Sequence, residues 1–199
     1  MATMEMGILP CAASEQFTMR TLAIGDIHGC SCSLVAPLKQ VRLEPDDQVI
    51  FLGDYIDHGP ASRQVVGFLL ELKKARSPVF LRGNHEVIIL EAREDPLKSH
   101  LWESYGGLET AFSYGANFRE DWASTIPVTH WTFLEQITKF VETDTHIFVH
   151  AWSFMNASNA WPCVFIRWMW GTVKYRIWSA GSLNTALLTM FAGKPSVPT

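Results

Sequence analysis

Three short motifs carry the residue types that bind metal ions, and each follows an apolar run. They are Gly25-Asp26-Ile27-His28-Gly29, Gly53-Asp54-Tyr55-Ile56-Asp57-His58-Gly59-Pro60 and Arg82-Gly83-Asn84-His85-Glu86. Asp26 and Asp54 lie 28 residues apart, and Asn84 follows 30 residues later. Because one strand–helix–strand unit fills about 30 residues, the three motifs are expected at the same edge of one parallel sheet. A cluster of carboxylates, imidazoles and one amide oxygen at that edge predicts a site for two divalent metal ions.

Each motif alone has a simpler interpretation. Gly25 could mark an ordinary strand-to-helix turn, and Asp26 could serve only as a helix N-cap. His150, at the end of a later apolar run, could be a structural histidine. Chance does not readily explain three such motifs in this order and at this spacing, so one shared site is the better interpretation.

Alternating strands and helices are expected to position the motifs. Three strands are predicted at the apolar runs Thr21–Ile24, Val49–Leu52 and Val79–Leu81. Helices are predicted after the motifs, at Ser33–Val41, Ala61–Arg76 and Asn84–Arg93. This alternation favours an α/β layered fold with a largely parallel sheet. The helical, aromatic segment Asp95–Lys139 is expected to cap or line the site, and two further strands are predicted at Phe140–Glu142 and His146–Val149.

Length and composition limit the function classes. A chain of 199 residues has the size of one domain. Its net charge of −4 gives no basis for nucleic-acid binding, and no apolar run reaches the ~18 residues of a membrane span.

Residues 1–18 contain no Lys or Arg and are expected to be a disordered tail rather than a signal peptide, with Met19 a candidate start of translation. The four cysteines lack metal-site or redox spacing, so reduced thiols and a cytoplasmic location are expected.

The last 48 residues, 152–199, differ from the rest of the chain. They contain no Asp, Glu or His but hold five of the eight tryptophans. Residues 1–151 carry 20 acidic and 12 basic residues, a net charge of −8, whereas residues 152–199 carry four basic residues. Two hypotheses remain open: a reading frame altered near codon 151, which we favour because the segment shows no clear periodicity, and a Trp-rich docking segment. The domain is accordingly assigned to residues 19–151.

Over roughly residues 20 to 151, the chain resembles the metallophosphoesterases of the phosphoprotein phosphatase type, which include the serine/threonine protein phosphatases and small bacterial relatives. That family has the patterns GDxHG, GDxxDRG and RGNHE, then a strand ending in His-Ala or His-Gly, as at His150-Ala151 here. The resemblance implies a layered sandwich with central mixed β-sheets flanked by helices. It also implies two divalent metal ions, with Mn²⁺ expected and iron or zinc as alternatives.

The resemblance assigns metal ligands by position. It implies that Asp26 and His28 hold the first ion, that Asp54 bridges both ions, and that Asn84 and His150 hold the second. Two metal ions about 3.5–4 Å apart lower the pKa of a water molecule and neutralise charge on a reacting phosphoryl group. This ligand set therefore fits hydrolysis of phosphate esters.

The resemblance also assigns residues to the substrate. His85, held by Asp57, would protonate the leaving oxygen, and a positioned acid contributes about 10²–10⁴-fold to the rate. A histidine beside a carboxylate stays protonated near neutral pH, which fits this role. Arg82 would hold the phosphoryl oxygens by a bidentate fork, assisted by Asn84 and His58.

The sequence departs from the family pattern at two positions, and both departures are expected to weaken binding at the site. His58 stands where the family has arginine, and a histidine cannot reproduce the bidentate contact. Weaker substrate binding is expected, by about 1–3 kcal/mol. The family also has a later histidine ligand, and no histidine follows His150. Looser binding of the second metal ion is therefore expected.

Three functions follow from these observations. The leading hypothesis is a serine/threonine phosphoprotein phosphatase, with a phosphoprotein or a phosphorylated small molecule as substrate. The alternative is a dinucleoside tetraphosphate hydrolase, whose members tend towards Asp where Glu86 stands. The third is a damaged, non-catalytic homologue that binds metal or phosphate. The oligomeric state is left open.

Overall fold

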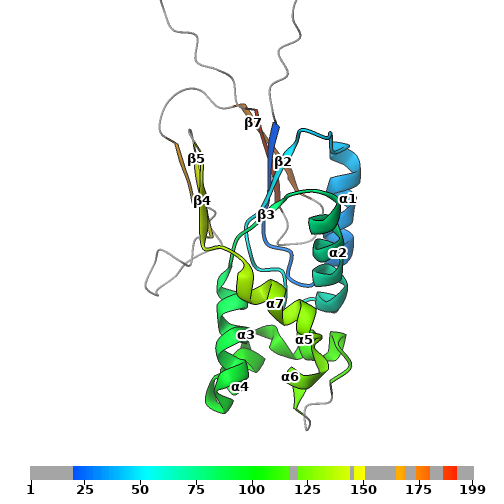
Figure 1. Ribbon diagram of the computed structural model, residues 1–199, viewed down its shortest axis with the longest axis vertical. Coiled ribbons are helices and arrows are strands. Elements are labelled where there is room, and N and C mark those ends of the chain that lie inside the picture. The colour runs from blue at the N-terminus through cyan, green and yellow to red at the C-terminus, as the bar shows by residue number, and fades with distance from the viewer. Residues whose placement is uncertain are drawn as a thin grey trace, which may run out of the picture.

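The computed structural model describes residues 20–116, 121–143 and 146–150, together with the backbone of three later strands at residues 165–168, 174–179 and 186–191 (Figure 1). The tail expected at residues 1–18 lies outside the described residues. The same holds for most of residues 152–199.

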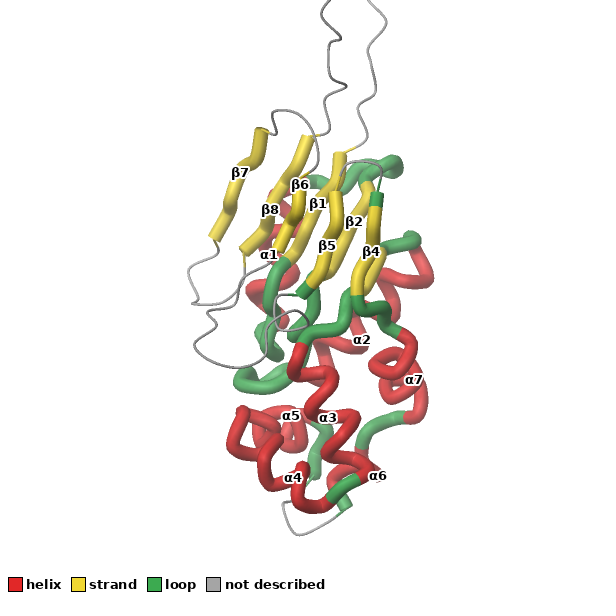
Figure 2. The backbone as a smooth tube through the Cα atoms, turned by 90° about the vertical axis from the view of Figure 1, so that its left-hand side faces the viewer, coloured by secondary structure: helices red, strands yellow, loops and turns green. Residues whose placement is uncertain are grey.

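Two β-sheets form adjacent layers (Figures 1 and 2). The larger has the strand order β3-β2-β1-β8-β7, and the smaller has the order β4-β5-β6. The strands are β1 (Arg20–Ile24), β2 (Gln48–Phe51), β3 (Val79–Phe80), β4 (Phe140–Glu142), β5 (His146–Val149), β6 (Phe165–Trp168), β7 (Lys174–Ser179) and β8 (Ala186–Phe191). β1, β2 and β3 run parallel, whereas β8 pairs antiparallel with both β1 and β7. The smaller sheet is antiparallel throughout.

Strands β1 and β2 of the larger sheet are buried on both faces, which explains their continuous apolar runs. Successive side chains of a strand point to opposite faces. Leu22 and Phe51 therefore face the helices and join the main core, whereas Ala23 and Ile50 face the smaller sheet and pack with Phe148. The site-bearing loops thus emerge from strands that are fixed on two sides.

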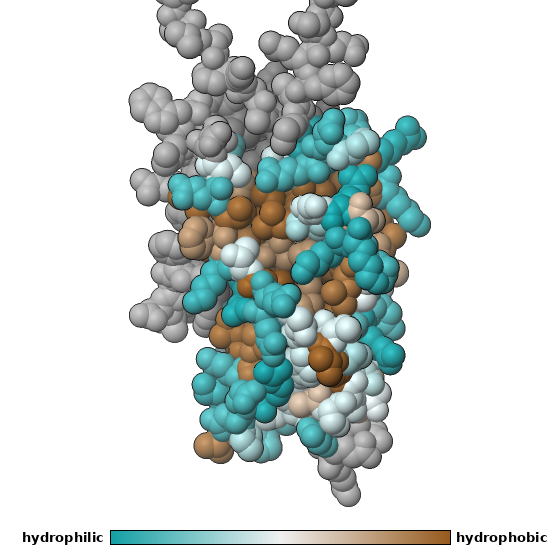
Figure 3. Space-filling view, in the orientation of Figure 1, coloured by the Kyte–Doolittle hydropathy of each residue, from teal (hydrophilic) through white to brown (hydrophobic). Residues whose placement is uncertain are grey.

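Helices cover one face of the larger sheet and extend beyond its carboxyl edge (Figure 2). They are α1 (Ser31–Val41), α2 (Ser62–Ala75), α3 (Asn84–Glu94), α4 (Pro96–Trp102), the kinked turn η1 (Glu103–Gly107), α5 (Leu108–Ser113), α6 (Trp122–Thr125) and α7 (Val128–Gln136). The apolar stripe predicted in α2 is buried at Val65, Val66 and Leu69. The exposed charged residues of the helices contribute to the hydrophilic surface in Figure 3.

The predicted fold class is confirmed: the protein is an α/β sandwich of two β-sheets, one mixed and one antiparallel, flanked by helices. The five strands predicted before His150 are all present within one residue or two of the expected ends. The larger sheet is mixed rather than largely parallel, because β7 and β8 from residues 174–191 add antiparallel strands to it. The boundary at residue 151 and the altered reading frame remain predictions.

The helices of the described residues include none that is long and apolar enough to cross a membrane.

Candidate metal centre

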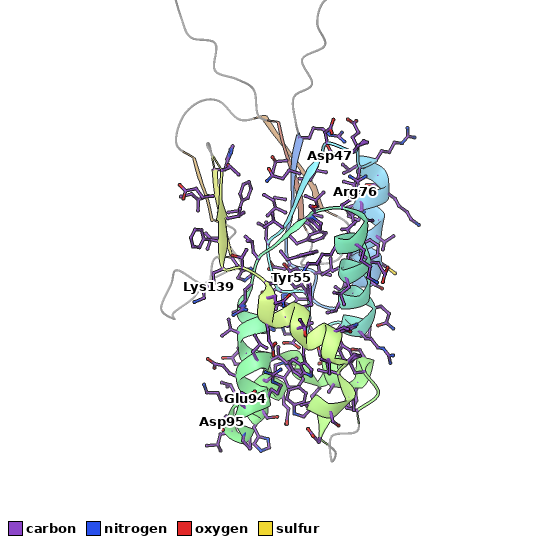
Figure 4. All side chains as sticks on the ribbon, viewed as in Figure 1. Asp47, Tyr55, Arg76, Glu94, Asp95 and Lys139 are labelled. Carbon is purple, nitrogen blue, oxygen red and sulfur yellow. The ribbon has the colours of Figure 1, made fainter. Side chains whose placement is uncertain are left out.

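The motif loops meet beneath the carboxyl ends of β1, β2 and β3. Figure 4 marks Tyr55 at this level and Asp47 at the opposite end of the strands. The backbone N–H groups of Ile27 and His28 both donate to the carbonyl of Asp54, at 2.9 and 2.8 Å. His28 and Asp54 have left-handed backbone conformations, with φ of 45° and 53°. Non-glycine residues in this region cluster at functional sites, where the surrounding structure holds them.

Gly53 allows three loops to approach one another. Its φ is +112°, and a Cβ there would lie 2.6 Å from the backbone nitrogen of Gly83 and 2.9 Å from Nδ1 of His150. A side chain at this position would therefore separate the second motif from the third and from the end of β5. This is the physical reason for the Gly-Asp pair at the end of β2.

Glu86 fastens the second motif to the third. Its carboxylate is fully buried and accepts hydrogen bonds from the backbone N–H groups of Asp54, Tyr55 and Gly83, at 2.9, 2.8 and 2.9 Å. Burial and the charge of Asp54 raise the pKa of Glu86 to about 7, and the backbone N–H groups oppose that rise. Because Glu86 has no exposed surface, it positions the loop and does not contact a substrate. The sequence singled it out only as a marker of substrate class.

The two histidines expected to bind metal are held in one orientation. Nδ1 of His28 lies 3.1 Å from the carbonyl of Ile56, and Nδ1 of His150 lies 2.9 Å from the carbonyl of Leu52. A carbonyl can only accept, so each Nδ1 is assigned as the protonated nitrogen. Nε2 of each ring then carries the lone pair and faces the site, as in metal-binding histidines generally.

The remaining ligand atoms converge on Nε2 of His150. It lies 3.1 Å from Oδ1 of Asn84 and 3.3 Å from Oδ2 of Asp54. Ligand atoms of Asp26, Asp54 and His150 all lie within 4.8 Å of one another. Nε2 of His28 lies 3.7 Å from the same Oδ2 of Asp54. The structure thus brings all five predicted ligands together, with Asp54 between the two histidines.

The electrostatics of the cluster are those of a site built for cations. Burial, followed by the charge of Asp54, raises the pKa of Asp26 to about 6. Burial alone would raise the pKa of Asp54, but hydrogen bonding to His150 and the charges of nearby histidines lower it. Burial likewise would lower the pKa of His150, but its hydrogen bond to Asp54 raises that pKa to about 9. The raised pKa values show that Asp26 and His150 tend to hold protons, and a bound metal ion would take the place of those protons.

The donor set fits two divalent ions. Carboxylates, an amide oxygen and oriented imidazoles suit Mn²⁺, Fe²⁺ and Zn²⁺, and a shared carboxylate such as Asp54 can bridge two of them. Asp26 and Asp54 are two buried carboxylates that share a site, and a bound cation would offset the cost of burying their charges.

His85 and Asp57 form a separate buried pair. Nδ1 of His85 lies 2.8 Å from Oδ2 of Asp57, whose side chain has no exposed surface. Burial alone would lower the pKa of His85, but this hydrogen bond and the charge of Asp54 raise it. The pair is therefore suited to hold a proton on Nε2 of His85, the ring nitrogen that Asp57 leaves free.

Sequence reasoning missed the groups that hold Asp57. Nε1 of Trp102 donates to both of its carboxylate oxygens at 3.0 Å, and the hydroxyl of Thr110 donates to Oδ1 at 2.8 Å. Trp102 and Thr110 belong to α4 and α5, within the segment expected to cap or line the site. Their spacing from Asp57, 45 and 53 residues, carries no local pattern that identifies them.

Arg82 and His58, two of the side chains predicted to bind phosphate, have different surroundings in the structure. Nη2 of Arg82 donates to the carbonyls of Leu134 and Glu135 at the end of α7. Within the described residues, no hydrogen bond or ion pair joins Arg82 to the predicted metal ligands, and its phosphate-binding role remains a prediction. His58 is exposed and lies beside the site, with its ring centroid 4.9 Å from that of His28 and 5.1 Å from that of His85.

Comparison with known proteins gives a family match over most of the chain. The sequence model described as Calcineurin-like phosphoesterase (Metallophos) matches residues 19–186. Serine/threonine-protein phosphatase 1 of Salmonella typhimurium is 40% identical over 85 residues, which are 42% of this chain and 37% of that protein. The symmetrical bis(5'-nucleosyl)-tetraphosphatase of Salmonella paratyphi B is 38% identical over 73 residues, which are 36% of this chain and 25% of that protein.

Among solved structures, a metallophosphoesterase from Sphaerobacter thermophilus superposes with a TM-score of 0.45 at 20% identity, over 67% of this chain and 46% of that one. The chain thus spans less than half the length of each of these relatives.

Proposed function

The chain belongs to the calcineurin-like phosphoesterase family, and we propose that it is a metal-dependent phosphoesterase that hydrolyses phosphoserine or phosphothreonine in proteins. The observation that carries the proposal is the His85–Asp57 pair, 2.8 Å apart and buried, beside five convergent side chains that we predict to bind metal. An acid beside a metal site is the arrangement that hydrolysis of a phosphomonoester requires.

The ligand side chains define where a metal pair would be held. Asp26 and His28 would hold one ion, Asn84 and His150 the other, and Asp54 both. When bound, the two ions would activate a water molecule and neutralise charge on the phosphoryl group. The side chains would contribute orientation, because each imidazole is fixed by a backbone carbonyl and Asp54 by its loop.

His85 would supply the proton for the leaving group. Attack by water on phosphorus breaks the bond to the serine or threonine oxygen, and that oxygen takes the proton from Nε2 of His85. Asp57 would hold the opposite ring nitrogen and stabilise the protonated ring, with Trp102 and Thr110 keeping the carboxylate in place. The products are inorganic phosphate and the free hydroxyl side chain.

The substrate class has one supported alternative. The similarity to a bis(5'-nucleosyl)-tetraphosphatase favours a dinucleoside tetraphosphate as the second candidate. Glu86 gives no contact-based reason to choose between the two, because it is buried beneath the loop.

The test compares the two substrates directly. The full chain, supplied with Mn²⁺, is assayed on a phosphoserine peptide and on diadenosine tetraphosphate, beside a His85→Asn variant. We expect a higher kcat/KM on the phosphopeptide and a loss of about 10²–10⁴-fold in the variant. A higher kcat/KM on diadenosine tetraphosphate would replace the proposal with the alternative, and no metal-dependent hydrolysis of either substrate would refute both.

A further inference from the structure

Three histidines form a cluster that the metal centre described above does not use as a unit. Suitable ring nitrogens of His28, His58 and His85 all lie within 4.8 Å of one another. Their ring centroids form a nearly equilateral triangle with sides of 4.7, 4.9 and 5.1 Å. The rings meet edge to face, at interplanar angles between 65° and 83°. We call this group the histidine triangle.

Two members of the histidine triangle are already oriented as ligands. Nδ1 of His28 is bound to the carbonyl of Ile56, and Nδ1 of His85 is bound to Asp57. Nε2 of each ring is therefore left for another partner. These bonds to a carbonyl and to a carboxylate are the ones that orient metal-binding histidines in proteins.

The third member, His58, is held by its backbone and exposed at its side chain. Its N–H donates to the carbonyl of Gly106 at 3.0 Å, and its φ is 61°. Gly106 leaves room for the ring, because a Cβ there would lie 2.6 Å from Nδ1 of His58. The histidine triangle thus has two fixed corners and one that solvent and ions can reach.

The size of the histidine triangle suits one small ion. Zinc binds imidazole nitrogen at about 2.0–2.1 Å, so tetrahedral ligands lie about 3.4 Å apart. Nitrogens no more than 4.8 Å apart reach that spacing by closing about 1.4 Å at most. Rotation of the exposed His58 side chain can shorten its distances to His28 and His85, and small shifts of the other two rings would close the third distance.

The chemistry of the histidine triangle differs from that of the neighbouring centre. Three imidazoles favour Zn²⁺, Ni²⁺ or Cu²⁺ over Mn²⁺, whereas the carboxylate and amide oxygens of the neighbouring centre accept Mn²⁺ as well as Zn²⁺. The two sites share His28, whose Nε2 also lies 3.7 Å from Asp54. His28 cannot complete both sites at once.

We propose that His28, His58 and His85 form an alternative zinc site that competes with the carboxylate-rich centre for His28. An ion there also occupies Nε2 of His85. If the proposed function holds, Zn²⁺ bound at the histidine triangle removes both a ligand of the first ion and the proton donor. Zinc then inhibits the Mn²⁺-activated enzyme.

The test measures Zn²⁺ and Mn²⁺ affinities of the metal-free full chain by competition with a coloured chelator. The variant is His58→Asn, because asparagine tolerates the left-handed backbone conformation of this position. His100→Asn is the control, since His100 is exposed on α4 and belongs to neither site.

We expect His58→Asn to weaken Zn²⁺ binding by about tenfold or more and Mn²⁺ binding by less than about twofold. His100→Asn should change neither affinity. An unchanged Zn²⁺ affinity in His58→Asn, or an equal loss for both metals, would overturn the proposal. A Zn²⁺ affinity that depends on His58 in a protein without hydrolytic activity would support the zinc site and refute the proposed function.

Discussion

At the scale of single residues, each histidine of the candidate site is oriented through the ring nitrogen that faces away from the site. The partners are the carbonyl of Ile56 for His28, the carbonyl of Leu52 for His150, and the carboxylate of Asp57 for His85. Either kind of partner leaves Nε2 directed into the site. A carboxylate partner also favours the protonated ring, which suits His85 to donate a proton when Nε2 holds no metal ion.

Removing the charge of Asp57 should change the pH dependence of hydrolysis. His85 must be protonated to act, and its pKa is raised in the native protein, so activity declines as pH rises through that pKa. In Asp57→Asn, burial still lowers the pKa of His85, but the Asp57 carboxylate no longer raises it. We expect kcat to fall by about 10²-fold or more and its alkaline decline to move to lower pH.

The measurement is the pH profile of kcat for the native protein and for Asp57→Asn, with saturating Mn²⁺. An alkaline limb at the same pH in both proteins would show that His85 does not depend on Asp57 for its proton.

At the scale of secondary-structure elements, the start of α3 and the end of α7 are tied to the site by side chains of the third motif. Glu86, in the first turn of α3, accepts three backbone N–H groups from the loops that carry Asp54 and Gly83. Arg82 donates to carbonyls at the end of α7, where a positive charge is favourable. The third motif therefore connects the site loops to α3 and α7, in addition to carrying a predicted metal ligand.

Glu86→Gln should weaken the hydrogen bonds between α3 and the loops that carry Asp54 and Gly83. The amide offers one accepting oxygen and a donating NH₂ group, so at least one buried backbone N–H loses its acceptor. We expect a loss of about 1–3 kcal/mol in the free energy of unfolding, measured by urea denaturation. Glu91→Gln is the matched control, because Glu91 lies exposed on the same helix and pairs with Lys98 at the surface. Equal stability of the two variants would contradict the role of Glu86.

Arg82→Met should act on α7. The substitution keeps an unbranched side chain but removes the hydrogen bonds to Leu134 and Glu135, and we expect a loss of about 1–2 kcal/mol in stability. Lys73→Met, at an exposed position of α2, is the control for loss of charge. A large rise in KM for a phosphopeptide with an unchanged urea midpoint would instead support the phosphate-binding role predicted from the sequence.

The sequence was sufficient to predict the elements that carry the ligands. Predicted ligands such as Asp26, Asp54 and Asn84 follow strands at regular spacing, so the sheet topology brings them together. The partners of Asp57 and the direction of Arg82 depend on how α4, α5 and α7 pack, which no local pattern encodes. β6, β7 and β8 were not predicted, because the segment that carries them shows no clear periodicity in its sequence.

At the scale of the whole molecule, the larger sheet depends on strands from both ends of the chain. β1 lies between β2 and β8, and its registered partners on β8 run from Leu187 to Phe191. The loop that follows β1 carries Asp26 and His28. Residues beyond 151 therefore support the first motif through the sheet, whatever the origin of their unusual composition.

Truncation tests this dependence. A chain ending at residue 185 lacks β8 and leaves β1 as an open edge, and such edges pair with other chains. We expect a loss of about 2–5 kcal/mol in stability from the missing ladder, with larger species in light scattering. A chain ending at residue 191 retains β8 and is the control. Equal stability of the two truncated chains would contradict the pairing of β1 with β8.

The most direct test of the proposed metal-dependent hydrolysis is a titration of the metal-free protein with Mn²⁺, following the hydrolysis of p-nitrophenyl phosphate. We predict a saturable rise in rate that requires two ions per chain, and a rate at least about 10³-fold lower in Asp54→Asn at every Mn²⁺ concentration. A native rate that does not respond to Mn²⁺, or an Asp54→Asn variant as active as the native chain, would contradict a two-metal centre built on Asp54.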